Sequence, residues 1–552
     1  MRYRTHLFYL VSLLLLISYY KSSAQAPKIE WAKCYGGSSV EVPYCIQQTS
    51  DGGYIAVGFT ESQDGDVYGL HDPATGGLGD AWIVKTDNIG KIVWTRTIGG
   101  SSEDRLYSIQ QTAGGYIAAG YTGSIDGDLT GINIDTIGYG QAWVIKLDTS
   151  GKTVWQKCYG GSGDENANSI VQTADSGYIF AGRTNSDDGD VSGTHKKDAT
   201  GLYFGYDIWV VKITATGAIS WQKTLGGGGD ETGQSIQQTT DGGYVVAGYT
   251  NSDDGDVTKH YGDGSTNDGW VVRLSGTGGL IWQKAYGGTA YDELNAVKQT
   301  PDGGYVFTGW TISNDDDVSG DHLNTSGNAT DDLWVVKTDT SGGINWQRCY
   351  GGSGHDGGND IQLTADSGFV VTGYTSSSDG DITGYHYDTS HPHDYWVLQL
   401  TNSGDINWNN CYGGSGEDDA YSIKVTSDGE YVVAGISSSL DDDVKGNHTN
   451  KIGDWWIVKL GSPLAINNVV GDPIALHVYP NPSNTRFIIN YALSAAASIE
   501  IADVAGKTIS NIMLNQNSHE AMVNAASWPS GVYFYKVVQD GTVVGNGKLM
   551  KE

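Results

Sequence analysis

Beyond its first two dozen residues, the sequence has no hydrophobic run long enough to cross a membrane as a helix. The apolar stretch at residues 7–20 is itself shorter than the roughly 20 residues that a spanning helix needs. It follows Arg2 and Arg4 and precedes the small residues 22–24, an arrangement typical of a secretory signal peptide. We therefore expect residues 1–24 to be a signal peptide and the mature chain to have no transmembrane segment.

Basic residues are also scarce: 32 lysines and arginines stand against 64 aspartates and glutamates, for a formal net charge of −32. So acidic a surface repels nucleic acid and anionic lipid, and it attracts cations or cationic partners. The apolar content of 38% and the 17 tryptophans argue against disorder, although glycine is frequent at 80 residues. The composition predicts a turn-rich β protein with no nucleic-acid partner.

No window shows a 3.6-residue hydrophobic period long enough for a helix, which excludes a helical solenoid. What recurs instead is one tryptophan, at gaps that run from 61 to 66 residues when the residue numbers are subtracted. A period in this range marks an array of units that cannot bury their apolar faces alone. The seven tryptophans are Trp31, Trp94, Trp155, Trp221, Trp282, Trp346 and Trp408.

One repeat reads as four short strands. Residues 169–173, 178–182, 209–213 and 218–223 are rich in Val, Ile, Tyr and Trp, and Gly/Asp/Ser clusters separate them. Four strands in each of seven units predict an all-β, seven-bladed β-propeller over residues 27–460.

The phase of the repeat predicts how the ring closes. If the segment at residues 169–173 is the inner strand, the last unit ends with its third strand at residues 456–460. An orphan fourth strand stands at residues 28–31, directly after the signal peptide. We expect this N-terminal strand to complete the last blade and so to remove an exposed sheet edge.

Cysteine is limited to five residues. Cys34, Cys158, Cys349 and Cys411 each stand three residues after the repeat tryptophan, and equivalent positions in different blades are too far apart for the roughly 4.4–6.8 Å Cα spacing of a disulfide. A Cys34–Cys45 bridge is the one that remains feasible. The other cysteines are predicted to be buried thiols.

An acidic turn follows the second strand of every unit, as Asp-Gly-Asp in five units and as Asp-Asp-Asp in two. Its carboxylates and the carbonyls of its loop are hard oxygen ligands that suit Ca²⁺, so these aspartates are the candidate metal ligands. The alternative is a structural turn, in which aspartate caps its own backbone and glycine supplies a positive φ. The EF-hand spacing and its distal glutamate are absent. The candidate ligands are Asp64, Asp66, Asp126, Asp128, Asp188, Asp190, Asp254, Asp256, Asp315, Asp317, Asp379, Asp381, Asp441 and Asp443.

A second carboxylate precedes the first strand of every unit, and we expect these seven to ring the mouth of the central channel on the same face as the acidic turns. They are Glu41, Asp104, Glu165, Glu231, Asp292, Asp356 and Asp418.

A second set of tryptophans opens the third strand of each unit, and packing between blades is the predicted role: Trp82, Trp143, Trp209, Trp270, Trp334, Trp396 and Trp456. Irregular loops, such as those at residues 68–79 and 195–206, differ between units and are candidates for recognition. His386, His391 and His393 stand close together beside Asp394, but their spacing matches no common metal-ligand pattern.

The hairpin at residues 143–157 resembles the repeat of quinoprotein-type propellers at the level of turn and tryptophan spacing. This resemblance extends over the repeat region and implies the fold, not the quinone chemistry.

After a linker at residues 461–473, the sequence changes character. Residues 474–552 resemble the C-terminal sorting domain of type IX secretion cargo in Gram-negative bacteria, because four motifs stand in the family's order and at its distance from the chain end. The motifs are Val-Tyr-Pro-Asn-Pro at 478–482, Asp-Val-Ala-Gly-Lys at 503–507, residues 528–537 and residues 547–552. The resemblance implies an immunoglobulin-like β-sandwich, recognition by the type IX machinery, and export to the outer cell surface or the medium.

The sequence shows no catalytic constellation, since its polar residues recur evenly, whereas an enzyme needs groups that only one or two blades carry. We therefore expect no catalytic or cofactor-binding residues. We interpret the chain as a secreted or cell-surface binding or structural module, with Ca²⁺ and a glycan or protein ligand on its acidic face. The alternatives are an extracellular propeller enzyme, either a glycan hydrolase or lyase or a quinoprotein-like oxidoreductase, and an assembly protein without a small ligand.

Overall fold

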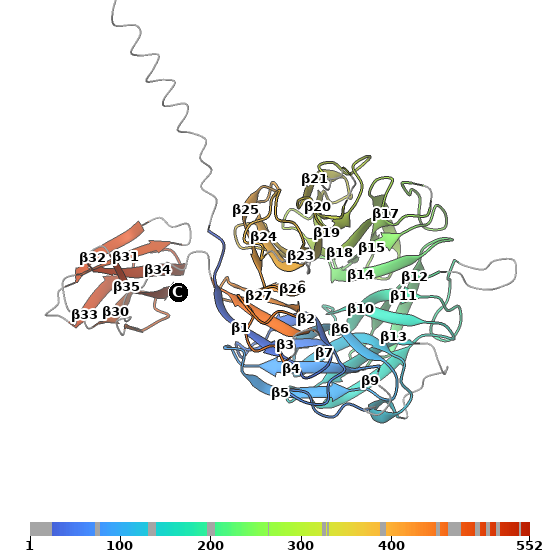
Figure 1. Ribbon diagram of the computed structural model, residues 1–552, viewed down its shortest axis with the longest axis horizontal. Coiled ribbons are helices and arrows are strands. Elements are labelled where there is room, and N and C mark those ends of the chain that lie inside the picture. Colours follow the sequence, from blue (N-terminus) through green and yellow to red (C-terminus); the bar gives the residue numbers. More distant parts are fainter. Residues whose placement is uncertain are drawn as a thin grey trace, which may run out of the picture. The chain divides into compact units, whose positions relative to one another are not determined.

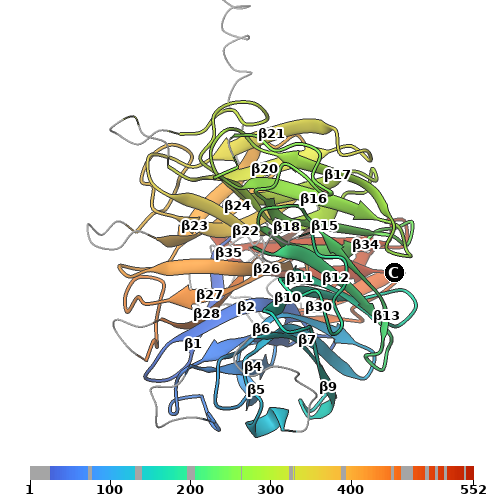
Figure 2. The same ribbon diagram turned by 90° about the vertical axis from the view of Figure 1, so that its right-hand side faces the viewer.

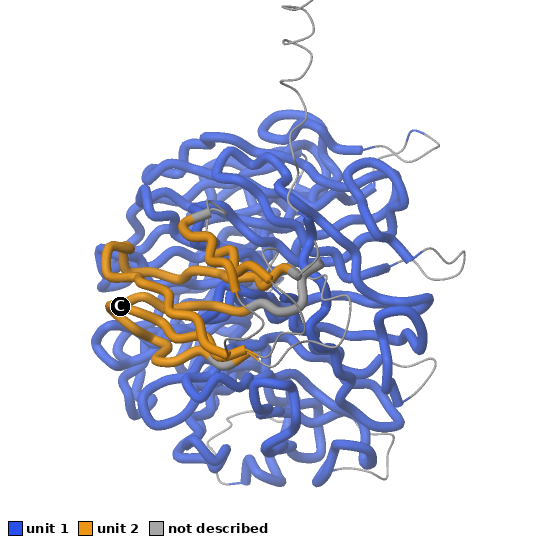
Figure 3. Tube along the Cα trace, turned by 90° about the vertical axis from the view of Figure 1, so that its left-hand side faces the viewer, with its two compact units in different colours: residues 1–461 blue, residues 462–552 orange. Residues whose placement is uncertain are grey.

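The computed structural model describes residues 25–552 apart from short gaps at 72–77, 131–139, 196–204, 263, 323–326, 328–329, 387–392, 449–452, 462–475, 492–496, 504–507, 515–518 and 540–541. The predicted signal peptide and nearly all of the predicted linker lie outside the described residues. The chain divides into two compact units, residues 1–461 and 462–552 (Figure 3).

The first unit consists of seven four-stranded antiparallel sheets arranged as a ring (Figure 1). This arrangement confirms the predicted seven-bladed β-propeller. The first blade is formed by β2 (Glu41–Gln48), β3 (Tyr54–Thr60), β4 (Asp80–Thr86) and β5 (Ile92–Ile98), and the second by β6 (Asp104–Thr112), β7 (Gly115–Thr122), β8 (Gln141–Leu147) and β9 (Thr153–Tyr159), with a 3-10 turn at Gly127–Leu129. The third blade is formed by β10 (Glu165–Gln172), β11 (Tyr178–Thr184), β12 (Asp207–Ile213) and β13 (Ile219–Leu225). The fourth is formed by β14 (Glu231–Gln238), β15 (Tyr244–Thr250), β16 (Asp268–Leu274) and β17 (Leu280–Tyr286).

The remaining blades complete the ring, and Figure 2 shows the strands in a view turned by 90°. They are β18 (Asp292–Gln299), β19 (Tyr305–Thr311), β20 (Asp332–Thr338) and β21 (Ile344–Tyr350); β22 (Asp356–Leu363), β23 (Phe369–Thr375), β24 (Asp394–Leu400) and β25 (Ile406–Tyr412); and β26 (Asp418–Val425), β27 (Tyr431–Ser437) and β28 (Asp454–Leu460) with β1 (Ile29–Tyr35).

The N-terminal strand closes the ring as the repeat phase predicts. Strand β1 pairs antiparallel with β28, from Ile29 opposite Leu460 to Tyr35 opposite Trp455. The N-terminal segment is held further by Tyr412 of β25 in the sixth blade, whose hydroxyl donates to the Pro27 carbonyl at 2.6 Å. Blade seven therefore contains both ends of the repeat region, and β1 covers the edge of β28 that would otherwise be free.

Both sets of tryptophans pack the joints between blades. The third-strand set, from Trp82 to Trp456, is fully buried, which confirms its predicted packing role. The repeat tryptophans lie on the outer strands, where each ring contacts the first aromatic residue of the second strand in the next blade, as Trp31 contacts Tyr54 with ring centroids 5.6 Å apart. Each such aromatic buries roughly 150–250 Å². The tryptophans recur once per repeat because each one packs at a contact between two adjacent blades.

The second unit is a small β-sandwich, as the sequence predicts. Its two sheets have the strand orders β29-β30-β33 and β32-β31-β34-β35. Phe487, Ile499 and Val537 are among the fully buried side chains that pack the two sheets together. Among the described residues, no helix is long and apolar enough to cross a membrane. The strands are β29 (His477–Tyr479), β30 (Arg486–Asn490), β31 (Ala497–Asp503), β32 (Thr508–Leu514), β33 (Glu520–Asn524), β34 (Gly531–Gln539) and β35 (Thr542–Lys551).

Candidate functional site

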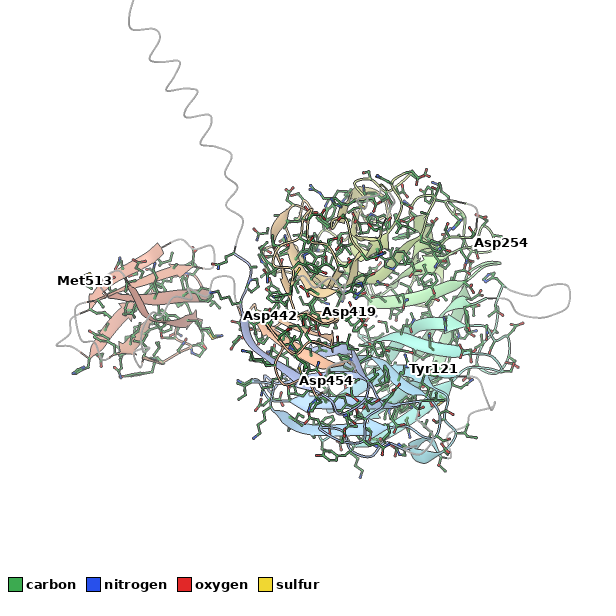
Figure 4. All side chains as sticks on the ribbon, viewed as in Figure 1. Tyr121, Asp254, Asp419, Asp442, Asp454 and Met513 are labelled. Atoms are coloured by element: carbon green, nitrogen blue, oxygen red, sulfur yellow. The ribbon has the colours of Figure 1, made fainter. Side chains whose placement is uncertain are left out.

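The acidic turns act first as structural turns. In the first blade, Asp64 Oδ1 accepts the Ser38 N–H at 2.7 Å, and the Asp66 N–H donates to the Gly36 carbonyl at 2.8 Å. The middle residue has a positive φ, 64° at Gly65, and the aspartates that replace glycine, Asp316 and Asp442, adopt 50° (Asp442 is labelled in Figure 4). The positive φ of the structural alternative is therefore confirmed. The carboxylate does not cap its own turn but binds the loop before the inner strand, and the same N–H bond recurs in every blade, at Asp126, Asp188, Asp254, Asp315, Asp379 and Asp441.

The candidate calcium ligands are distributed one pair to a blade. Within the described part of the chain, the one group of three or more His, Cys, Asp or Glu side chains close enough to hold a metal is His393, Glu417 and Asp419, and it contains none of the candidates. Calcium binding by the acidic turns remains a prediction.

The expected ring of seven carboxylates at the channel mouth is wrong. All seven are fully buried, at the first residue of each inner strand. Glu41 Oε1 accepts the Thr60 hydroxyl at 2.7 Å, and its Oε2 accepts the Gly37 N–H at 3.0 Å. These carboxyls tie the loop between two blades to the end of the second strand.

A β-bulge explains this error. Pro43 pairs with Gly58 and Cys45 pairs with Val57, so Tyr44 has no partner on β3. The extra residue reverses the alternation of side chains along the strand. Residues after the bulge line the channel, whereas Glu41, which precedes it, is buried. Every inner strand has this bulge at the same place.

A second buried carboxyl lies beside most of these groups. Gly36 separates Glu41 from Asp454, which is labelled in Figure 4, and a Cβ on this glycine would lie 3.0 Å from Asp454 Oδ1. Burial raises the pKa of Glu41 to about 7 and also raises the pKa of Asp454. Six of the seven joints contain such a pair, and Gln141 replaces the strand-three acid in the seventh.

A recurring histidine, which the sequence analysis missed, binds the strand-three acid. His322 Nδ1 lies 2.6 Å from Asp332 Oδ2, and this hydrogen bond raises the pKa of His322 to about 9. The same Nδ1 contact is made by His71, His195, His386 and His448. Each histidine stands five residues after the second aspartate of its acidic turn, a fixed offset that could have been found in the sequence.

Three of these histidines also connect neighbouring blades. His71 Nε2 lies 3.6 Å from Asp128, and His195 and His386 make similar contacts with Asp256 and Asp443. In these three blades the second aspartate of the acidic turn is thus a partner of the preceding blade's histidine.

The histidines near residue 390 do not form a shared site. His386 contacts Asp394, whereas His393 Nδ1 lies 3.0 Å from Asp419 and its ring stacks on Tyr374. His391 lies outside the described residues.

The inner strands enclose an axial channel of about 530 Å³, which continues into a second cavity of about 400 Å³. The seven bulge residues line both cavities. Three are tyrosines from consecutive blades, and four are amides from the other blades. The residues are Tyr421, Tyr44 and Tyr107 on one side and Asn168, Gln234, Asn295 and Asn359 on the other.

The tyrosines form one aromatic cluster, in which the Tyr44 ring lies 5.0 Å from Tyr107 and 6.0 Å from Tyr421. The amides are linked around the ring, since Asn168 Nδ2 donates to Gln234 Oε1 at 3.1 Å. The channel wall is therefore aromatic on one side and amide-lined on the other, an asymmetry that the sequence analysis did not detect.

Serine and glutamine side chains bridge adjacent inner strands, which are not paired by a β-ladder. The Ser169 hydroxyl accepts the Ile236 N–H at 3.3 Å, and Gln237 Oε1 accepts the Gln299 N–H at 2.7 Å. Equivalent serine bonds are made by Ser108, Ser235 and Ser422. Ser and Gln thus recur at the same spacing within the repeats because their side chains bridge adjacent inner strands at the channel wall.

Replacing Ser169 with alanine is expected to lower the free energy of unfolding by about 1 kcal/mol, because the Ile236 N–H then loses its partner. The midpoint of urea denaturation measures this change. Ala296→Ser is the matched control, because it adds a hydroxyl where one inner strand lacks it, and it should not destabilise the ring. Equal losses for both variants would contradict the bridging role.

All five cysteines are free thiols, so the feasible Cys34–Cys45 bridge does not form. Cys34 packs in the core of the last blade, where burial raises its pKa to about 12, and Cys45 lines the channel. The two side chains lie in different places because Cys34 is on β1 in the last blade and Cys45 is on β2 in the first.

Comparison with known proteins distinguishes the two units. Residues 477–552 match the model of the secretion system C-terminal sorting domain. The second unit is a type IX sorting domain. The chain is therefore cargo of that secretion system, exported to the cell surface or the extracellular space, and its sorting domain is the part that interacts with the machinery.

No curated protein matches the chain. Solved structures resemble it only distantly. A fungal alcohol oxidase of the AA5 family in complex with copper is 10% identical with a TM-score of 0.41, covering 96% of this chain and 100% of that one. Sqt1 from Chaetomium thermophilum is 9% identical with a TM-score of 0.40, covering 79% and 100%. A glycoside hydrolase family 43 arabinoxylan arabinofuranohydrolase from Bacillus subtilis is 12% identical with a TM-score of 0.27, covering 93% and 94%. Similarity at this level carries no argument about function.

Proposed function

We propose that the exported propeller is a binding module that holds a hydroxyl-rich glycan in its axial channel. The observation that supports this proposal is the division of the channel wall into a tyrosine side and an amide side. Ligand sites are concave, with aromatic walls and a few placed polar groups, and usually measure about 300–1,000 Å³. The channel has both properties.

The two sides of the channel suit a sugar ring. A tyrosine ring offers an apolar face to the C–H groups of a sugar and a hydroxyl to its polar edge. Amide side chains both donate and accept hydrogen bonds, as sugar hydroxyls require. Within the described part of the chain, the Tyr107 and Tyr421 hydroxyls make no hydrogen bond to protein, whereas Tyr44 accepts one from Arg105. Two tyrosine hydroxyls are therefore available to a ligand.

Screening the mature chain on a glycan array tests the proposal directly. For the tightest ligand found, we expect Tyr107→Ala to weaken binding about tenfold or more, which corresponds to about 1.4 kcal/mol. Isothermal titration calorimetry measures the dissociation constant. Val154→Ala is the control, because Val154 is exposed on the outer strand β9 and lies outside the channel lining. Failure of every glycan to bind, or equal losses in both variants, would overturn the proposal.

Calcium at the acidic turns is the second part of the proposed function. One oxygen of each first aspartate is engaged by a backbone N–H, which leaves the other carboxylate oxygen as the ligand available at Asp64. We expect added Ca²⁺ to raise the melting temperature of the propeller and a chelator to reverse the rise. Thermal denaturation measures this effect. Asp64→Asn, which keeps the acceptor for Ser38 but removes the charge, should reduce it, and an unchanged melting temperature in the parent protein would contradict calcium binding.

A further inference from the structure

The inner strand β18 lacks both the serine and the glutamine that bridge adjacent inner strands elsewhere in the ring. At the serine position β18 has Ala296, and at the glutamine position it has Lys298. Four other blades have glutamine where β18 has lysine: Gln47, Gln110, Gln237 and Gln362. Alanine has no hydroxyl, and an ammonium group cannot accept an N–H. Strand β18 therefore lacks two stabilising contacts at the same point of the channel wall. A purely structural role does not explain why Ala296 and Lys298 stand there.

Lys298 lines the channel, and in the described part of the chain its ammonium makes no hydrogen bond to protein. The charged side chains that act on its pKa are Asp360 and Lys424, which also line the channel. Asp360 is already satisfied: its Oδ2 accepts Lys424 Nζ at 2.6 Å and the Ile423 N–H at 3.0 Å. Its Oδ1 accepts the Gln362 amide at 2.8 Å.

The channel lining thus has two ammonium groups against one carboxylate, although the whole protein has a net charge of −32. Lys298 is half-buried, and partial desolvation penalises a charge that has no partner. Desolvation lowers the pKa of Lys298, whereas its pair with Asp360 raises the pKa of Lys424. Of the two lysines, Lys298 is the one whose charge the protein leaves uncompensated.

We propose that Lys298 selects acidic saccharides, by placing one ammonium against the anionic group of a sugar held between the tyrosine and amide walls. This inference rests on the proposed glycan-binding function and specifies its ligand class. An anion at this position would supply the missing charge and would accept hydrogen bonds from the ammonium group. The acidic outer surface does not oppose it strongly, because at physiological ionic strength exposed charges are screened beyond about 8 Å.

The test uses the full mature chain and a uronic acid trisaccharide, compared by isothermal titration calorimetry with its methyl ester. The two probes have the same ring hydroxyls and differ in charge. We expect the acid to bind at least tenfold more tightly than the ester, and Lys298→Gln to abolish that ratio. Glutamine occupies the equivalent position in four other blades, so the variant should fold, and its melting curve verifies this.

Lys91→Met is the control for net charge, because Lys91 is exposed in a hairpin outside the channel lining. It should retain the preference for the acid. A sulfated trisaccharide forms a further arm, and tight binding that depends on Lys298 would support the same anion pocket with sulfate as the group. Equal binding of acid and ester, or an acid preference that survives Lys298→Gln, would overturn the inference and leave glycan binding intact. Binding of none of the probes, together with an empty glycan array, would overturn both.

Discussion

Lowering the pH from about 8.5 to about 5.5 is expected to raise the melting temperature of the propeller. Burial raises the pKa of Glu41, Asp104 and Asp418 to about 7, and the pKa of Asp268 to about 8. A carboxyl with a raised pKa in the folded state contributes stability that is present below its unfolded pKa and is lost as the pH rises through the folded pKa. The stability that these carboxyls contribute is therefore lost progressively between about pH 4 and about pH 8.

The histidines act in the same direction. Hydrogen bonding to Asp332 raises the pKa of His322 to about 9, and hydrogen bonds to Asp207 and Asp394 likewise raise the pKa of His195 and His386. A histidine with a raised pKa also loses its contribution as the pH rises. One pKa unit is worth about 1.4 kcal/mol, and solvent screening reduces this for the partly exposed histidines, so most of the effect comes from the buried carboxyls.

Thermal denaturation at a series of pH values measures this dependence. Glu41→Gln is the matched variant, since it removes one titrating group while its amide oxygen can still accept the Gly37 N–H and its NH2 group can donate to the Thr60 hydroxyl. It should reduce the difference between the two pH values. Stability should fall again at strongly acidic pH, because the pKa of Asp51 is lowered to about 2 and its stabilising charge is lost as the pH falls through that range. A melting temperature that rises with pH between 5.5 and 8.5 would contradict the assignment.

Removing residues 25–35 is expected to destabilise the propeller severely. The deletion eliminates β1, whose residues pair with β28 from Ile29 to Tyr35 and pack against the core of blade seven. An unpaired β28 would expose buried side chains such as Trp456 and Val458 along a free strand edge. We expect aggregation, or a melting temperature lower by more than roughly 10 °C, since core losses of several kcal/mol accumulate.

A synthetic peptide of residues 25–35 provides the control for this deletion. If β1 acts by completing the sheet, the peptide should bind the truncated protein and restore its melting temperature. A peptide with Trp31→Ala should restore less, because Trp31 packs on Tyr54 of the first blade. A truncated protein that melts at the original temperature would show that ring closure contributes little.

Most of the fold could be read from local patterns. The repeat tryptophans gave the number of blades, and the position of residues 28–31 gave the closure, because both depend on sequence order and on strand hydrophobicity. The motifs of the tail gave the sorting domain, because they stand in a fixed order near the chain end. The recurring histidine stands at a fixed offset from the acidic turn, so the same kind of local pattern also predicts it.

The directions of the inner-strand side chains could not be predicted in this way. A bulge at Tyr44 moves Glu41 from the expected channel mouth to the blade joint, and composition and spacing do not reveal where a strand gains an extra residue. The same bulge turns Tyr44 toward the axis, so the aromatic side of the channel was also missed.

The sequence by itself determined the count, order and closure of the blades and the identity of the export domain, because these depend on periodic local signals. The tertiary structure alone decided which polar residues meet. Seven separated segments converge on one axis, and only their three-dimensional register places Lys298, Asp360 and Lys424 in the same channel. Contacts between residues more than sixty positions apart depend on ring geometry, which no local pattern encodes.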